Sequence, residues 1–177
     1  SDVYAERWED AEEALGRDDF ADLFLHLRMI FSKVRARREL LKEFPEQVLS
    51  AYLPTKAAEF VDDVVVPYAD AYEQIRDQSY AAVAGAGKVN SWFKRLAQLD
   101  NNDWRPPALW ALRTHADDPQ WLDDFFRALE RLASSMLLRR VYATPRSQRY
   151  ADLLRELADG KGLDSPSFLL SDVEKAE

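Results

Sequence analysis

The chain has 177 residues, 47% of them hydrophobic, and a formal net charge of −8 at pH 7. This apolar fraction, together with 5 Trp, 7 Tyr and 9 Phe, excludes a disordered chain and suffices for the core of one domain of this length. The lack of Cys excludes disulfides and thiolate metal sites, and the acidic balance argues against a protein that coats DNA broadly.

Two amphipathic helices are predicted at the start of the chain. The first spans about residues 3–15 and ends at Gly16, where a left-handed backbone is least costly. Asp18 or Asp19 then caps a second helix over about residues 20–36, whose apolar residues recur at helical spacing.

A long helix is predicted in the next part of the chain, after two shorter segments over 37–44 and 45–52. It spans about residues 56–79 and contains Pro67, which has no backbone N–H to donate. We therefore expect a kink or a split near residues 63–67.

The second half of the chain is predicted to continue as helices separated by short turns. The expected helices span about residues 89–99, 107–114, 119–141 and 145–158, with a last short one opened by Ser165-Pro166. The helix over 119–141 begins with Pro119 after the acidic cap Asp117-Asp118 and carries one apolar stripe. The stripe consists of Leu122, Phe125, Phe126, Leu129, Leu132, Ala133, Met136 and Leu137.

No stretch shows the apolar–polar alternation and the flanking turns of a strand. We predict one all-α domain over residues 1–177, a compact multi-helix bundle or orthogonal helical array, with a sub-boundary near residues 81–88. No stretch is apolar over the length of a membrane span. The chain begins without Met, and its acidic first residues lack the pattern of a signal peptide. We therefore expect a cytoplasmic fragment of a longer protein.

Charge is distributed unevenly along the chain. Residues 1–24 contain nine acidic and two basic residues, whereas residues 28–42 contain six basic residues and one acidic residue. Solvated helix faces explain such runs, and a surface for a polyanion or another partner is the alternative.

The turn between the helices over 119–141 and 145–158 concentrates basic residues. Its four arginines are Arg139, Arg140, Arg146 and Arg149. In one interpretation they are structural. Cations favour the C-terminal end of a helix dipole, and Arg149 and Arg155 can pair with Asp152 and Glu156. In the other, the four arginines and Tyr142 or Tyr150 line a groove that contacts the phosphates of a nucleic acid or nucleotide.

Motifs that carry catalysis are missing from the sequence. The segment 81–87, AAVAGAG, lacks the spacing of a phosphate-binding loop, and no serine lies in a nucleophile-elbow context. His26 and His115 are interpreted as structural or surface residues. The helical carboxylate pairs lack the Glu-x-x-His partners of a di-iron site and are expected to be solvated: Glu9/Glu13, Asp62/Asp63 and Asp123/Asp124. We expect no catalytic residue, no metal site and no cofactor in this chain.

Two stretches resemble a known family. The order WLDDFFRALERLASSMLLRR followed by TPRSQRYADLLREL is similar to the C-terminal helical region of GmrSD-type restriction proteins. The opening stretch, YAERWEDAEEALGRDDFADLFLHL, resembles the segment that follows their ParB-like domain. These bacterial phage-defence proteins join a ParB-like, NTP-using domain to this helical region, often followed by an HNH-type nuclease domain.

The resemblance implies that catalysis is located elsewhere in a larger protein. The nucleotide motifs of the family belong to the ParB-like domain and its nuclease motif to the HNH-type domain, and neither is present here. No catalytic residue can therefore be carried over. The implied role is a non-catalytic scaffold that packs beside other domains of the parent protein and contacts DNA. The alternative is a stand-alone helical module that binds another protein.

Overall fold

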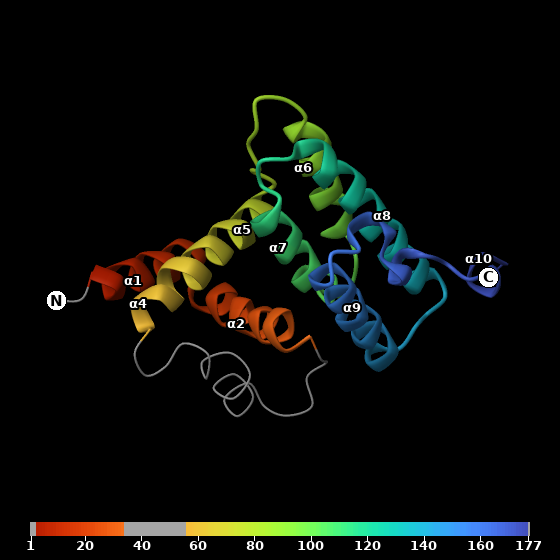
Figure 1. The fold of residues 1–177 in the computed structure, drawn as a ribbon, viewed down its shortest axis with the longest axis horizontal. Helices are drawn as coiled ribbons and strands as arrows, with labels where there is room; N and C mark the ends of the chain where they lie inside the picture. Colours follow the sequence, from red (N-terminus) through yellow and green to blue (C-terminus); the bar gives the residue numbers. More distant parts are fainter. Residues whose placement is uncertain (1–2, 34–55, 177) are drawn as a thin grey trace.

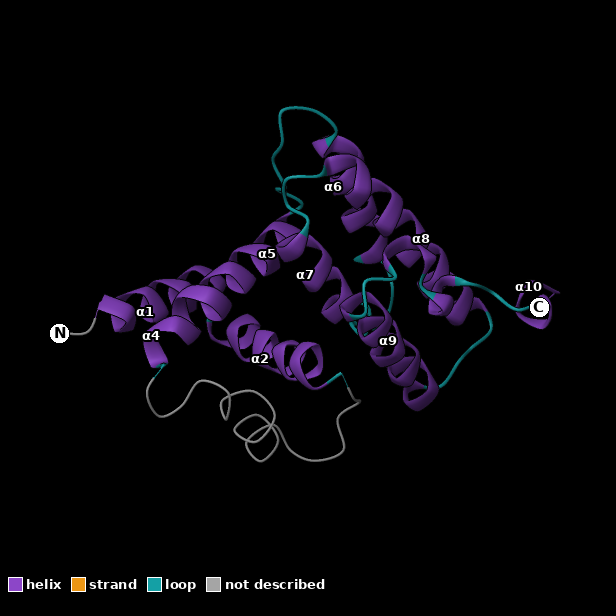
Figure 2. Ribbon diagram, in the orientation of Figure 1, coloured by secondary structure: helices purple, strands orange, loops and turns teal. Residues whose placement is uncertain are grey.

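The computed structural model describes residues 3–33 and 56–176. Within these ranges the chain forms helices and connecting loops, and no strand (Figure 2). The all-α prediction is therefore confirmed. The helical segments predicted over 37–44 and 45–52, and most of the basic run over 28–42, lie outside the described residues.

The helices form two arms that meet at α7 (Figure 1). The first arm contains α1 (Val3–Leu15), α2 (Arg17–Ser32), α4 (Ala57–Phe60), the π-helical η2 (Val61–Val65) and α5 (Val66–Asp77). The second arm contains α6 (Ala86–Leu96), α8 (Pro119–Leu138) and α9 (Ala143–Ala158). Helix α7 (Arg105–Thr114) contacts α2 and α5 of the first arm and α8 and α9 of the second.

A short C-terminal segment follows α9; its first part packs back onto the second arm, and its last helix projects beyond α8 (Figure 1). It consists of the 3-10 turns η3 (Gly162–Asp164) and η4 (Pro166–Phe168) and the helix α10 (Asp172–Ala176). Only η4 was anticipated as a helix, because Ser165-Pro166 resembles a helix start. The 3-10 turn stops after Phe168, whose ring is buried and meets Phe125 edge-on at 5.5 Å between ring centroids.

One continuous apolar core runs through both arms. Its largest fully buried side chains include Trp104, which lies just before α7, and Phe93 and Phe126 from α6 and α8. The last two rings meet edge-on, with their centroids 4.8 Å apart. Two prolines fit the first turn of α7 because backbone N–H groups have no intrahelical partner there. This helix therefore begins at Arg105, two residues earlier than predicted.

The corner between α1 and α2 depends on Gly16. Its φ of 83° is in the left-handed region, where only glycine is free of strain. The chain reverses at this residue, and its carbonyl accepts the N–H of Phe20 at 2.9 Å. The second helix consequently begins at Arg17, and the predicted caps Asp18 and Asp19 lie inside its first turn. The predicted cap was wrong because the glycine turns the chain in one residue.

The long helix predicted over 56–79 is interrupted by the π-helical turn η2. The N–H of Val66 donates to the carbonyl of Val61, five residues earlier. Pro67 follows directly, and a proline ring inside a regular α-helix clashes with the carbonyl four residues before it. A wider π turn accommodates such a clash without ending the helix. The irregularity expected near residues 63–67 is therefore confirmed.

The end of α8 is a left-handed turn with an arginine in place of the usual glycine. Arg140 has a φ of 54°. The N–H of Arg140 donates to Leu137 and that of Val141 to Met136, at 3.0 and 2.9 Å. This is the Schellman pattern, and it ends the helix three residues earlier than predicted.

Replacing Arg140 with glycine is expected to raise the free energy of unfolding by about 1 kcal/mol, because glycine adopts a left-handed backbone without steric cost. Urea denaturation followed by circular dichroism measures this change. Arg140→Ala is the matched control, since it also removes the guanidinium but keeps the Cβ that causes the strain. A glycine variant no more stable than the alanine variant would contradict the prediction.

Candidate functional site

The four predicted arginines lie around the turn that joins α8 to α9, but they have different surroundings. Arg139 and Arg140 follow the last residue of α8, and Arg146 and Arg149 lie in the first half of α9. We call this region the basic turn. Three of the four arginines are paired within the chain, as the following contacts show.

Arg139 and Arg149 both contact Glu174 of α10. The distance from Arg149 Nη1 to Glu174 Oε1 is 2.9 Å, and that from Arg139 Nη2 to the same oxygen is 3.6 Å. The other nitrogens of Arg149 donate to the carbonyls of Ser167 and Leu169, both at 2.9 Å. Arg149 therefore ties the C-terminal segment to α9.

Arg146 joins α9 to the loop before α7. Its Nε donates to Asp103 Oδ2 at 2.5 Å, and its Nη1 donates to the carbonyl of Val141 at 3.2 Å. The side chain is 20% exposed. The carboxylate partner lies 43 residues earlier in the chain, so spacing along α9 gave no signal for this pair.

Arg140 is the exposed arginine of the basic turn, and its side chain has no ion pair or hydrogen bond with the described residues. The side chain of Tyr142, two residues later, is 83% exposed. Tyr150 is fully buried, so of the two tyrosines considered for a groove only Tyr142 is accessible. Arg140 and Tyr142 thus present a cation and an aromatic ring to solvent at the same turn.

A second group of polar residues lies inside the first arm, where α2, α5 and the start of α7 meet. Asp22 Oδ2 accepts hydrogen bonds from Tyr72 Oη at 2.9 Å and Arg105 Nη1 at 3.3 Å, and lies 3.0 Å from His26 Nε2. The same Arg105 nitrogen donates to Tyr72 Oη at 2.7 Å. We call these four residues the Asp22 cluster. Helical spacing does not predict the Asp22 cluster, because its members come from three helices.

Opposing effects set the charge state of the Asp22 cluster. Burial by itself raises the pKa of Asp22, but the hydrogen bond and charge of His26, the hydrogen bond of Tyr72 and the charge of Arg105 outweigh it. The pKa of Asp22 is therefore lowered. Burial raises the pKa of the Tyr72 hydroxyl, which stays protonated. Its one proton is shared between Asp22 Oδ2 at 2.9 Å and Asp19 Oδ1 at 3.2 Å.

A pocket of about 240 Å³ opens beside the Asp22 cluster. Its walls include His26 and Arg28 of α2, Asp103 before α7, and Ser147 of α9. Acidic and basic groups are mixed in these walls, and Asp103 already pairs with Arg146. The pocket therefore has no single-sign charge that would select an anion or a cation.

The lowered pKa of Asp22 predicts loss of stability in acid. The ionised carboxylate stabilises the fold fully above the unfolded-state pKa of about 3.9, and this contribution disappears as the pH falls through the lower folded-state pKa. Asp22→Asn should therefore unfold at lower urea concentration than the wild type at pH 6, and the difference should shrink at pH 3. Equal differences at both pH values would contradict this assignment.

Both histidines are at least partly buried, and four of the six carboxylates in the helical pairs are exposed as expected: Glu9, Glu13, Asp62 and Asp63. The ring of His115 stacks on Trp121 with 3.6 Å between centroids, and burial lowers its pKa against the opposing charge of Asp118. Asp123 is 4% exposed and accepts the Trp92 indole N–H at 2.7 Å. The expectation that Asp123 is solvated was wrong, because its helix face meets α6.

One feature of the sequence indicates a structural role for Glu174. Ser171 and Glu174 have the Ser-x-x-Glu spacing of a capping box. The N–H of Glu174 donates to Ser171 Oγ at 3.2 Å, and the N–H of Ser171 donates to Glu174 Oε2 at 2.7 Å. The spacing indicates the short helix α10 but not its contact with the basic turn.

Within residues 3–33 and 56–176, no group of three or more histidines and carboxylates is placed to hold a metal ion. None of the described helices combines the length and the apolar character that crossing a membrane requires. No protein-family model, curated protein or solved structure matches the chain.

Proposed function

We propose that this chain is a non-catalytic helical scaffold in a cytoplasmic DNA restriction protein similar to the GmrSD type. It positions an NTP-using domain and a nuclease domain of the parent protein, and its basic turn contacts DNA. The proposal rests on the resemblance of the two stretches described above. Charged side chains connect the helices through ion pairs and hydrogen bonds, and these ties support a scaffold role.

Three of these ties connect elements far apart in sequence. Arg105 links α7 to Asp22 of α2, and Arg146 links α9 to Asp103. Arg76 of α5 donates to Asp19 Oδ2 and to the carbonyl of Leu15, both at 3.0 Å. Charged groups paired in this way hold helices in a defined arrangement, which is what a domain that positions its neighbours needs.

The exposed arginine and tyrosine of the basic turn support contact with DNA. A guanidinium without a carboxylate partner is free to bind a phosphate, and such contacts release counterions from the DNA. The chain carries a net charge of −8, so the contact has to be local. The contact orients the chain on the DNA and adds little to the affinity for DNA.

DNA binding by the whole chain, measured by fluorescence anisotropy at several salt concentrations, tests this contact. Arg140→Ala is expected to lower the slope of log affinity against log salt by about 1, since one phosphate contact is lost. Arg113→Ala is the matched control, because Arg113 is an exposed arginine at the end of α7, outside the basic turn. Equal slopes for both variants and the wild type would refute the contact.

The alternative is a stand-alone module that binds another protein. Exposed apolar side chains near the basic turn and the C-terminal segment favour it: Leu138, Tyr142, Leu169 and Val173 are 82%, 83%, 67% and 68% exposed. Exposed apolar side chains that lie close together mark protein interaction surfaces. The coding sequence upstream separates the two proposals, since the restriction proposal requires a ParB-like domain in the same reading frame.

A further inference from the structure

Two guanidiniums from different helices converge on one carboxylate oxygen at the basic turn. Glu174 Oε1 lies 2.9 Å from Arg149 and 3.6 Å from Arg139, and the side chains of the two arginines are 24% and 12% exposed. Hydrogen bonds from charged donors to charged acceptors are the strongest that proteins form. Arginine donors suit a carboxylate and a phosphate equally well. The pair therefore forms an anion-binding site that the chain fills with its own side chain.

The two oxygens of Glu174 have separate partners. Oε2 accepts the N–H of Ser171 and closes the capping box of α10, while Oε1 faces the arginines. The hydrogen bond from Ser171 and the charges of Arg149 and Arg139 outweigh the effect of burial and lower the pKa of Glu174. The carboxylate is consequently ionised at neutral pH and occupies the site as an anion.

The attachment of α10 to the basic turn is polar. The helix contains no buried residue, and Val173 is 68% exposed. The last fully packed side chain before it is Phe168, which is 3% exposed. Apolar packing ends at Leu170, which is partly buried against the core, so α10 can leave the arginines without opening the core.

Resting on the proposed function, we propose that Arg139 and Arg149 form a binding site for a backbone phosphate of DNA, and that Glu174 occupies this site in the free chain. The phosphate and Glu174 compete for the same donors. DNA binding thus requires α10 to move away from the basic turn, and the exposed Arg140 beside the site makes the first contact. The acidic C-terminal segment therefore sets the affinity of the basic turn.

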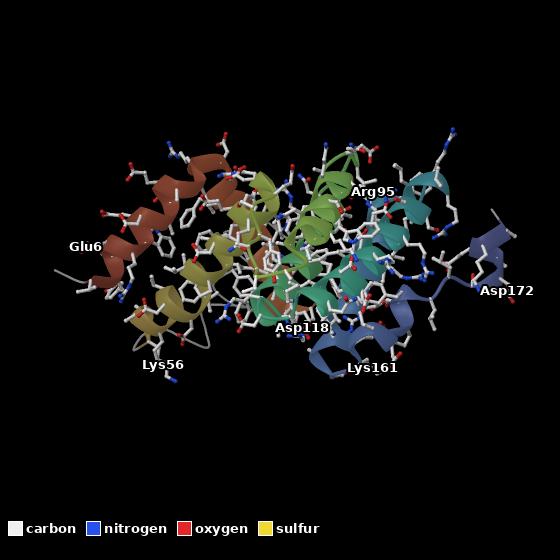
Figure 3. All side chains as sticks on the ribbon, turned by 90° about the horizontal axis from the view of Figure 1, so that it is seen from above. Glu6, Lys56, Arg95, Asp118, Lys161 and Asp172 are labelled. Atoms are coloured by element: carbon white, nitrogen blue, oxygen red, sulfur yellow. The ribbon has the colours of Figure 1, made fainter. Side chains whose placement is uncertain are left out.

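Glu174→Gln tests this competition on the whole chain. Glutamine also closes a capping box, so α10 keeps its cap while the negative charge is lost. The matched control is Asp172→Asn, which makes the same change in net charge on the same helix. Asp172 is fully exposed at the outer end of the molecule, and its ion partner is Lys175 at 3.9 Å (Figure 3).

Fluorescence anisotropy with a duplex oligonucleotide should show about tenfold tighter binding by Glu174→Gln than by the wild type or Asp172→Asn. The slope of log affinity against log salt should change little, because the wild-type complex makes the same phosphate contact once α10 has moved away. Adding Arg139→Ala to Glu174→Gln should remove most of the gain in affinity, because one of the two phosphate donors is lost. The Arg139 side chain otherwise bonds Ser135 Oγ of its own helix, so this change leaves the core intact.

The outcomes separate the two proposals. If Glu174→Gln and Asp172→Asn bind DNA equally, the competition is refuted, whereas binding that depends on Arg140 still supports the proposed function. If the wild type and all variants fail to bind, both proposals are refuted. Hydrogen exchange gives a second readout, because the amides of residues 171–176 should lose protection when DNA is added.

Discussion

Leu129→Ala is expected to lower the free energy of unfolding by about 3 kcal/mol. Leu129 lies in the middle of α8, and its side chain is completely buried in the core. Truncation to alanine removes the transfer free energy of the lost methyl groups and leaves a cavity that the surrounding side chains fill only in part. Urea denaturation followed by circular dichroism measures the loss directly.

Leu138→Ala is the matched control for this prediction. It makes the same chemical change on the same helix, but at a side chain that is 82% exposed. A surface substitution of this kind changes the free energy of unfolding by less than about 0.5 kcal/mol. Comparable losses for the two variants would mean that α8 does not bury its predicted stripe.

Arg105→Ala is expected to cost about 3 kcal/mol as well, for an electrostatic reason. The guanidinium donates to Tyr72 Oη and Asp22 Oδ2 at 2.7 and 3.3 Å, and it lies over the rings of Tyr72 and Trp104 at 5.1 and 5.6 Å. Its removal leaves the Asp22 carboxylate in a half-buried place without its cationic neighbour from α7. The same denaturation experiment applies.

Arg95→Ala provides the comparison. Arg95 also pairs with a carboxylate, Glu130 at 3.8 Å, and lies over the Trp92 ring at 5.2 Å, but its side chain is 60% exposed. Exposed ion pairs contribute at most about 1 kcal/mol. If Arg105→Ala cost no more than Arg95→Ala, the Asp22 cluster would not be a tie between α2, α5 and α7.

These two predictions concern the two kinds of contact that join the helices. The apolar stripe of α8 forms much of the core of the second arm, and the Asp22 cluster ties α7 to the first arm. Loss of either kind of contact should destabilise both arms, because α7 contacts helices of each arm. A single cooperative transition in denaturant is therefore expected for the wild type.

The helices and their buried faces were largely predictable from the sequence. Of the eight residues in the predicted stripe of α8, seven are buried, and only Leu137 is 40% exposed. The cap at Asp118 is also correct, since its Oδ1 accepts the N–H of Trp121 at 3.0 Å. Such features depend on residues within a few positions of one another, so the helical period and the cap residue are sufficient to predict them.

Arg155 contacts Asp152 of its own helix, as the sequence predicted. The partners of the other charged residues that join helices were decided only by the tertiary structure. Arg105 meets Asp22 across 83 positions, Arg146 meets Asp103 across 43, and Arg149 meets Glu174 across 25. A charged side chain can pair with any opposite charge that the fold brings near, and composition does not choose among them. By itself the sequence therefore determined an all-α chain with a concentration of arginines in one turn. The packing of the helices determined that three of those arginines are paired within the chain and that Arg140 remains exposed.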